Sequence, residues 1–154
     1  MAAPMIEGQP IVEAMDAERF RGEFLGCCAL VEDHACAAIE RLVQLGKVKK
    51  SPFLFGQKFE LVRKHADLPG LWTHREHVAQ ALDHLVPYVE LRGTICHAVF
   101  SPAFMENQSG ISWRMPGERD WRLRRMMTET ELLALLSGLR QSVERFLKQR
   151  LKAA

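Results

Sequence analysis

The sequence lacks a strong net charge. Its 154 residues include 21 lysines and arginines against 19 aspartates and glutamates, so the formal net charge is only +2. Global charge therefore does not identify a nucleic-acid binder, and any such signal must be local. The chain also has no internal repeat and no low-complexity segment. With 47% hydrophobic and 26% charged residues, this composition and length predict one globular domain.

Segments that would place the chain in a membrane are also missing. The first 20 residues have no basic stretch followed by an apolar run, so no signal peptide is expected. No apolar run approaches the roughly 18 residues that cross a bilayer. Residues 1–15, which contain two prolines and one glycine, are predicted to form a flexible arm before a single helical domain over residues 16–154. We therefore expect a cytoplasmic protein with no membrane partner.

Redox, metal and cofactor motifs are absent from the sequence. The four cysteines form no C-x-x-C pair and lie in apolar helical patterns, which predicts reduced thiols. His74 and His77 are three residues apart, but no matching Cys, His or carboxylate cluster lies nearby in sequence, so no metal site is predicted. There is no phosphate-binding glycine loop and no G-x-S-x-G elbow. We expect no cofactor.

The sequence does contain a strong helical pattern. Apolar residues at three- and four-residue spacing predict helices near 16–45, 54–66, 74–99 and 129–150. Asp16 is placed to cap the first helix. The pairs Thr73/Glu76 and Thr128/Glu131 have the T-x-x-E pattern of a capping box, which predicts the starts of the third and fourth helices.

Between the third and fourth predicted helices the period of the pattern changes. GISWRM (110–115) and WRLRRM (121–126) alternate apolar and polar residues, and PGERD between them has turn chemistry. Two short strands near 111–115 and 121–126 are therefore predicted. The expected fold class is all-α: a four-helix up-down bundle with a short β-hairpin between helices 3 and 4.

The third predicted helix carries an arginine on its apolar side. In VELRGTICHAVFSP, Arg92 lies three and four residues from apolar members of the stripe. An unpaired guanidinium is costly to bury, so Arg92 needs an acidic partner, a dimer seam or an anionic ligand. His97 follows about 140° further round the helix. Gly93, one turn before His97, leaves a gap that a partner backbone or a phosphate could approach.

Ordinary structural roles also fit these residues. An internal arginine commonly pairs with a carboxylate, for which Glu32 or Glu90 could serve. A histidine near a helix end commonly caps it or is a satisfied core group. The spacing alone leaves the structural and the functional interpretations open.

The context of the motif resembles the HEPN superfamily. Nucleases of that superfamily carry R-x(4–6)-H near the C-terminal end of the third helix of a four-helix bundle, and Arg92 and His97 match this pattern. LVEDHACAAIERLV, FLFGQKFELVRKHA, VPYVELRGTICHAVF and SWRMPGERDWRLRRM also look like successive parts of bacterial HEPN-like proteins. The similarity is most specific in ELRGTICHAVF. Those proteins commonly have Asn or Asp after the arginine, where this chain has Gly93.

The resemblance implies a metal-independent endoribonuclease with Arg92 and His97 as its catalytic pair. It also implies a homodimer whose two motifs meet at a two-fold seam near Gly93, and a glutamate, Glu32, that orients Arg92. RNA and a cognate antitoxin protein are the implied partners, as in a toxin–antitoxin or defence system. The alternative is a non-catalytic dimeric HEPN-like module that binds a protein partner or nucleic acid, which Gly93 favours.

The predicted hairpin is the local basic feature of the chain. It holds five arginines with two tryptophans among them, namely Arg114, Arg119, Arg122, Arg124, Arg125, Trp113 and Trp121. Arginines with aromatic neighbours suit phosphate contact and base stacking, so these residues are candidates for nucleic-acid binding. The same pattern fits a solvated strand face whose tryptophans pack inward, and both interpretations stay open.

Overall fold

The computed structural model describes residues 16–105, 107–120, 122 and 124–153. The elements in chain order are α1 (Ala17–Gln44), α2 (Phe55–Lys64), a 3-10 turn (Arg75–His77), α3 (Val78–His97), β1 (Val99–Met105), β2 (Gln108–Arg114), β3 (Arg125–Thr128) and α4 (Glu129–Leu147). The predicted N-terminal arm, residues 1–15, and Trp121 lie outside the described residues. None of the helices described is long and apolar enough to cross a membrane.

The all-α prediction is wrong, because a three-stranded antiparallel sheet accompanies the four helices. The strands lie in the order β1-β2-β3, and β1, which directly follows α3, was not predicted. The Ser101–Pro102 pair looks like the stop of a helix in the sequence, but α3 already ends at His97 and Pro102 lies opposite Ile111 in the sheet. Proline is tolerated there because β1 is an edge strand.

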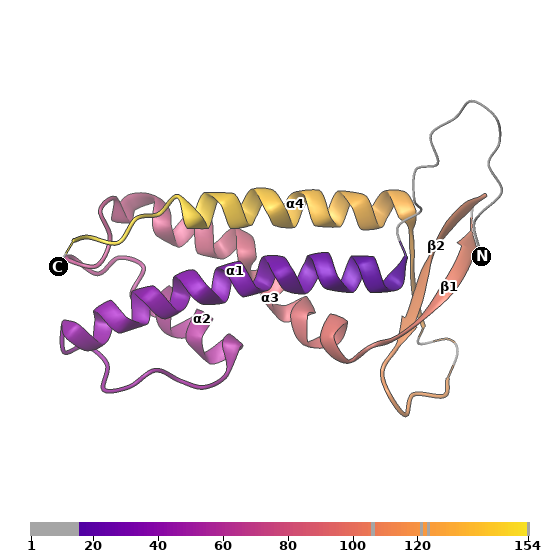
Figure 1. Ribbon diagram of the computed structural model, residues 1–154, viewed down its shortest axis with the longest axis horizontal. Helices are drawn as coiled ribbons and strands as arrows, with labels where there is room; N and C mark the ends of the chain where they lie inside the picture. Colours follow the sequence, from indigo (N-terminus) through magenta and orange to yellow (C-terminus); the bar gives the residue numbers. More distant parts are fainter. Residues whose placement is uncertain (1–15, 106, 121, 123, 154) are drawn as a thin grey trace.

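The predicted up-down order of the helices is also wrong. Arg21 near the start of α1 meets Ala98 just after α3, so α1 and α3 are antiparallel. Arg63 near the end of α2 pairs with Asp83 near the start of α3, at 3.0 Å, so α2 and α3 are antiparallel too. Figure 1 shows α1 and α4 both beginning at the sheet end of the molecule. Only α3 therefore runs toward the sheet, and the connection over residues 45–54 returns along α1.

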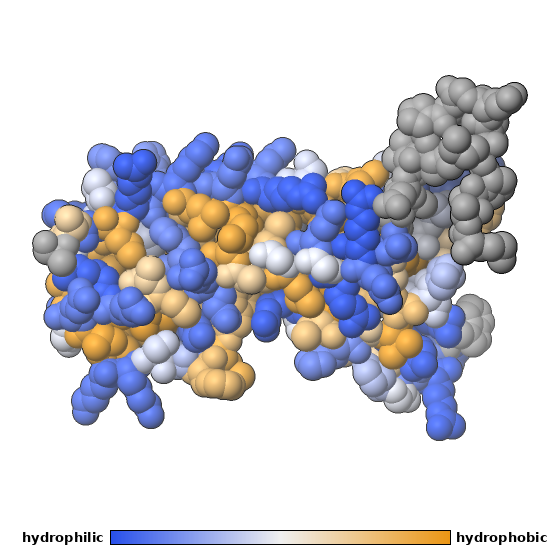
Figure 2. Space-filling view, viewed as in Figure 1, coloured by the Kyte–Doolittle hydropathy of each residue, from blue (hydrophilic) through white to orange (hydrophobic). Residues whose placement is uncertain are grey.

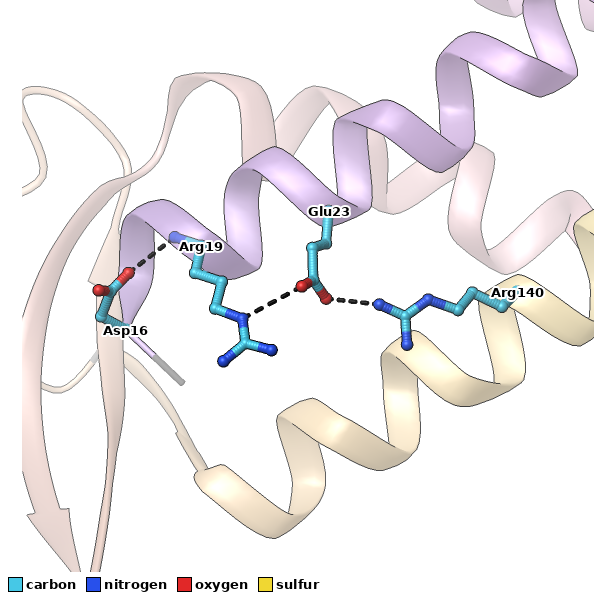
Figure 3. Close-up of polar contacts among 4 residues, drawn as sticks. All are labelled: Asp16, Arg19, Glu23 and Arg140. Carbon is cyan, nitrogen blue, oxygen red and sulfur yellow. Dashed lines mark hydrogen bonds and ion pairs between the residues drawn. The ribbon is translucent and has the colours of Figure 1, made fainter. Parts of the chain in front are cut away.

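Glu23 ties α1 to α4. Its carboxylate accepts from Arg19 Nε at 3.1 Å and from Arg140 of α4 at 2.6 Å (Figure 3). The backbone N–H of Arg19 donates to the Asp16 carboxylate at 2.7 Å, so the predicted cap of the first helix is confirmed. These polar contacts hold the sheet-side halves of α1 and α4 next to each other.

Only one of the two predicted capping boxes forms. The Thr128 and Glu131 side chains exchange hydrogen bonds with each other's backbone at the start of α4. Thr73 makes no such box, because its backbone N–H donates instead to the carbonyl of Arg150 at 2.9 Å. A 3-10 turn follows, and α3 begins only at Val78, without a side-chain cap.

The core continues from the helices into the sheet. Phe100 of β1 packs edge-on against Phe20 of α1 and Trp113 of β2, with ring centroids 6.3 Å and 6.1 Å away. Ile111 of β2 is also buried, so one face of the sheet covers the ends of the helices. Figure 2 shows apolar residues interspersed with charged ones over the visible face, including the stretch between α2 and the sheet.

Candidate functional site

The candidate site lies in the last turns of α3, where the helix meets the sheet. Arg92 is half-buried, while Gly93 and His97 are exposed. His97 is the last residue of α3, so its ring stands at the junction with β1. The five-residue spacing separates Arg92 from His97 by about 140° around the helix. The two side chains thus leave α3 in different directions, with the open position of Gly93 between them.

Arg92 is held by an aromatic ring. Its guanidinium lies 4.7 Å from the centroid of the Phe55 ring at the start of α2. No carboxylate forms an ion pair with Arg92 in the part of the chain that the structure describes. A guanidinium over a ring face is stabilised by about 0.5–2 kcal/mol, and its donors stay free to bind an anion. The aromatic partner was missed because Phe55 appears in the sequence as an ordinary core residue.

The Cys28 thiol beside this arginine is not a nucleophile at neutral pH. Burial raises the pKa of Cys28 to about 12, and the positive charge of Arg92 only partly opposes that shift. A thiol with such a pKa stays protonated at neutral pH. Cys28 therefore has no part in the chemistry considered for this site.

Glu32, the predicted orienting residue, is placed against α2. One of its carboxylate oxygens lies 3.8 Å from Lys58 Nζ. Lys58 is one turn beyond Phe55, so Glu32 and Arg92 both contact α2, at neighbouring turns. Any influence of Glu32 on Arg92 would thus pass through α2, and the orienting role stays a prediction.

Arg21 of α1 is a positioning residue that the sequence did not indicate. Its guanidinium donates to the carbonyls of Cys96 and Ala98, at 3.1 Å and 2.8 Å, and lies 4.5 Å from the centroid of the Phe100 ring. A cation at a helix C-terminus satisfies carbonyls that have no partner within the helix. Arg21 therefore fixes the backbone on both sides of His97.

Replacing Arg21 with methionine is expected to lower the free energy of unfolding by about 1–2 kcal/mol. The substitution keeps much of the apolar stem but removes both hydrogen bonds to the end of α3, in a half-buried setting. Urea unfolding followed by circular dichroism measures the change. Arg145→Met, at an exposed position of α4, is the matched control. Its free energy of unfolding is expected to stay within about 0.5 kcal/mol of wild type. Equal losses in both variants would contradict the positioning role.

The predicted basic hairpin is divided between buried and exposed groups. Trp113 is only 5% exposed, so its ring faces are covered and it packs inward. Arg122 is held by Asp120 at 2.9 Å, and this hydrogen bonding holds the pKa of Asp120 below its ordinary value. The guanidinium of Arg122 is thus already engaged, whereas Arg114 and Arg125 belong to no ion pair among the described residues.

Two pockets that share Arg114 lie along the sheet. The larger, of about 450 Å³, is lined by Arg114, Gly117, Glu118, Arg119, Asp120 and Arg124. The smaller, of about 110 Å³, is lined by Thr94, Trp113, Arg114, Met115 and Arg125. Because Thr94 lies one turn before His97, the smaller pocket opens beside the last turn of α3.

The sheet brings the predicted hairpin close to the end of the helix that carries Arg92 and His97. Arg114 lies opposite Val99, two residues after His97, and Arg125 lies opposite Trp113 on the next strand. The sheet therefore places Arg114 and Arg125 near the end of α3, where Thr94 lines a pocket with both. Within the described ranges, no group of three or more His, Cys, Asp or Glu residues could hold a metal ion.

Comparison with known proteins gives no match. No protein-family model fits the sequence, and neither the curated proteins nor the solved structures include a significant match. The site is therefore interpreted from its own geometry. That geometry is a helix end carrying an exposed histidine, next to pockets lined by arginine.

Proposed function

We propose that the protein is a metal-independent endoribonuclease of HEPN-like type, working in the cytoplasm as part of a toxin–antitoxin or defence system. The observation that carries the proposal is the junction of α3 and the sheet. There a pocket lined by Thr94, Arg114 and Arg125 opens beside the last turn of α3, which ends at His97. Arg92 stands free of any carboxylate partner among the described residues. Such a surface suits a phosphodiester, because its groups are cationic or can transfer protons at neutral pH.

The chemistry follows from the residue types. The ribose 2′-oxygen attacks the adjacent phosphorus, the bond from phosphorus to the 5′-oxygen breaks, and a 2′,3′-cyclic phosphate forms. His97 moves the proton between the 2′-hydroxyl and the leaving oxygen, and a guanidinium stabilises the extra negative charge on the phosphoryl oxygens. Arg92 takes this second role in the proposal, since its donors remain available above the Phe55 ring.

A homodimer would complete this site. Arg92 and His97 diverge by about 140° on one helix, so a second α3 across a two-fold axis is needed to face both groups toward one phosphate. The seam proposed is the second half of α3, where Val89 and Cys96 are only half-buried and Gly93 is open. A cognate antitoxin is proposed to act by covering this same surface.

Gly93→Ala is expected to stabilise the fold of the protomer and to weaken the dimer. An added methyl meets nothing within 4 Å in one protomer, so the substitution should stabilise the helix by about 0.5–1 kcal/mol. At a close helix–helix seam the same methyl should weaken dimerisation at least tenfold. Sedimentation velocity at tens of micromolar protein measures the dimer fraction.

Gly26→Ala in α1 is the matched control for Gly93→Ala, since it is also an exposed helical glycine with open space around it. It should raise stability in the same way without changing assembly. A wild type that stays monomeric at this concentration, or equal dimer fractions in both variants, would exclude the seam at Gly93.

The test of the activity uses RNA in the presence of a chelator. Wild-type protein is incubated with a structured and an unstructured RNA in EDTA, and the new 3′ ends are examined by mass spectrometry. The proposal expects cleavage with 2′,3′-cyclic phosphate ends. Cleavage that requires added Mg²⁺, or that leaves 3′-hydroxyl ends, would disprove this mechanism.

A non-catalytic RNA- or protein-binding module is the second candidate, and Gly93 favours it. HEPN-like nucleases commonly have a polar residue after the arginine, whereas Gly93 offers no side chain to contact the phosphate. RNA binding in gel-shift experiments without any cleavage would support this candidate. Gly93→Asn then tests whether the missing side chain is the reason, since it should restore cleavage.

A further inference from the structure

We propose that the small pocket at the end of α3 holds one phosphate group of the RNA strand, next to the phosphate that is cleaved. This inference rests on the proposed function and names the substrate contact of the same site. The pocket is lined by Thr94 of α3, Trp113 and Arg114 of β2, Arg125 of β3, and Met115. It joins three elements at the point where His97 ends α3.

The charge of the pocket wall selects an anion. Among the described residues, Arg114 and Arg125 are the only charged ones that line it, and none of these lining residues is a carboxylate. Neither arginine belongs to an ion pair among the residues the structure describes. Two guanidinium groups on one small cavity repel each other unless an anion lies between them, and paired guanidinium forks match the oxygens of a phosphate.

A buried indole N–H gives a second, independent indication of a ligand. Trp113 is 5% exposed, and its Nε1 is buried without a hydrogen-bond partner. In the described part of the chain, only Arg41 Nε shares this condition. A buried donor without an acceptor costs about 1–3 kcal/mol. Trp113 also lines the small pocket, so a small rotation of its ring toward a bound phosphate would give this N–H an acceptor.

The size of the pocket suits a small ligand group. Its volume of about 110 Å³ is enough for a tetrahedral phosphate. Arg114 also borders the pocket of about 450 Å³, so the strand can continue from one pocket into the next. The small pocket is thus a positioning site beside His97, and the larger one receives the adjoining nucleotide.

A methylphosphonate scan tests this placement without requiring cleavage. Single-stranded 2′-O-methyl RNA hexamers, which have no reactive 2′-hydroxyl, are each made neutral at one successive backbone phosphate. Binding is followed by fluorescence anisotropy at about 50 mM salt, where phosphate contacts are strong. One position should weaken binding at least tenfold more than the others. Equal weakening at every position would overturn the proposal.

Arg125→Gln connects that position to the pocket. This exposed residue can be replaced without disturbing the core, and the variant should bind the unmodified hexamer at least tenfold more weakly. In this variant the scan should become flat. Arg145→Gln, on the far end of α4, is the matched control and should keep the wild-type pattern. A scan that remains peaked in Arg125→Gln would place the phosphate elsewhere and overturn the proposal.

Indole resonances distinguish an RNA phosphate from a free anion. The ¹H–¹⁵N signal of Trp113, assigned with Trp113→Phe, should shift when the hexamer binds. Inorganic phosphate should cause the same shift only at concentrations at least a hundredfold higher. Equal potency of the two would make this a free-anion site and overturn the role in holding a strand. If the scan is peaked but native RNA is never cut, the nuclease proposal fails, whereas the pocket remains a site for one phosphate of a bound RNA strand.

Discussion

Alanine at His97 is expected to slow RNA cleavage by a factor of about 10² or more. The substitution removes the group that transfers protons between the 2′-hydroxyl and the leaving oxygen. Arg92→Ala should lose at least as much, because the charge that develops on the phosphoryl oxygens loses its fixed partner, at a cost of several kcal/mol. Single-turnover cleavage in chelator, with enzyme in excess over a labelled RNA, measures both rates.

The two variants need a check of their fold. His97 is exposed, so His97→Ala should unfold at the same urea concentration as wild type. Arg92→Ala also removes the contact with Phe55, so Arg92→Lys is its companion. Lysine keeps a cation near the ring but lacks the guanidinium fork, so it should stay folded and cleave poorly. Wild-type rates in both alanine variants would assign the cleavage to another site or to a contaminant.

Gly110→Ala is expected to destabilise the fold by about 3 kcal/mol or more. Gly110 of β2 lies opposite Thr128, and a Cβ there would collide with the carbonyl oxygen of Met127 and lie 2.9 Å from Thr128 Cα. Both obstacles are backbone, so the strand and the start of α4 must shift together. Urea unfolding followed by circular dichroism measures the loss.

Gly22→Ala is the same substitution at another glycine, and it is expected to stabilise the fold. Gly22 is an exposed residue of α1, and an added methyl meets nothing within 4 Å. The alanine should stabilise the protein by about 0.5–1 kcal/mol, since it reduces the freedom of the unfolded chain. If the two variants change stability in the same direction, the close approach of β2 to β3 has no energetic role.

The parts of the fold that were predicted correctly depend on local sequence. The Asp16 cap and the Thr128 capping box involve residues three positions apart, so their hydrogen bonds can be anticipated from the pattern. The Thr73 box failed because the N–H it needs bonds to Arg150, a residue 77 positions later. No local rule contains that competitor, and tertiary contacts override the capping preference.

The missing strand has a similar explanation. VFSPAFM has the composition of a strand, but its proline suggested the end of a helix. The proline is acceptable only because β1 is at the edge of the sheet, and strand order is a property of the whole fold. Without β1, the prediction could not place the arginines of the hairpin next to the end of α3.

The candidate site was likewise predicted in its residues and not in its arrangement. Spacing along one helix placed Arg92 on the stripe and His97 at the helix end. Arg21, which binds the carbonyls beside His97, is 75 residues from Cys96 in sequence and looks like an ordinary polar-face residue of α1. Thr94 could not be identified as a site residue from the sequence, because the sheet places it in the same pocket as Arg125.

The contact between α1 and α4 has a consequence for synthesis. Glu23 and Arg140 are 117 residues apart, so the face of α1 that packs on α4 has no partner until α4 has been translated. This face remains exposed to water or to chaperones during that interval. Closing so long a loop also raises the contact order, which slows folding relative to bundles of neighbouring helices. On the ribosome, this protein is therefore expected to acquire its native structure late and in one cooperative step.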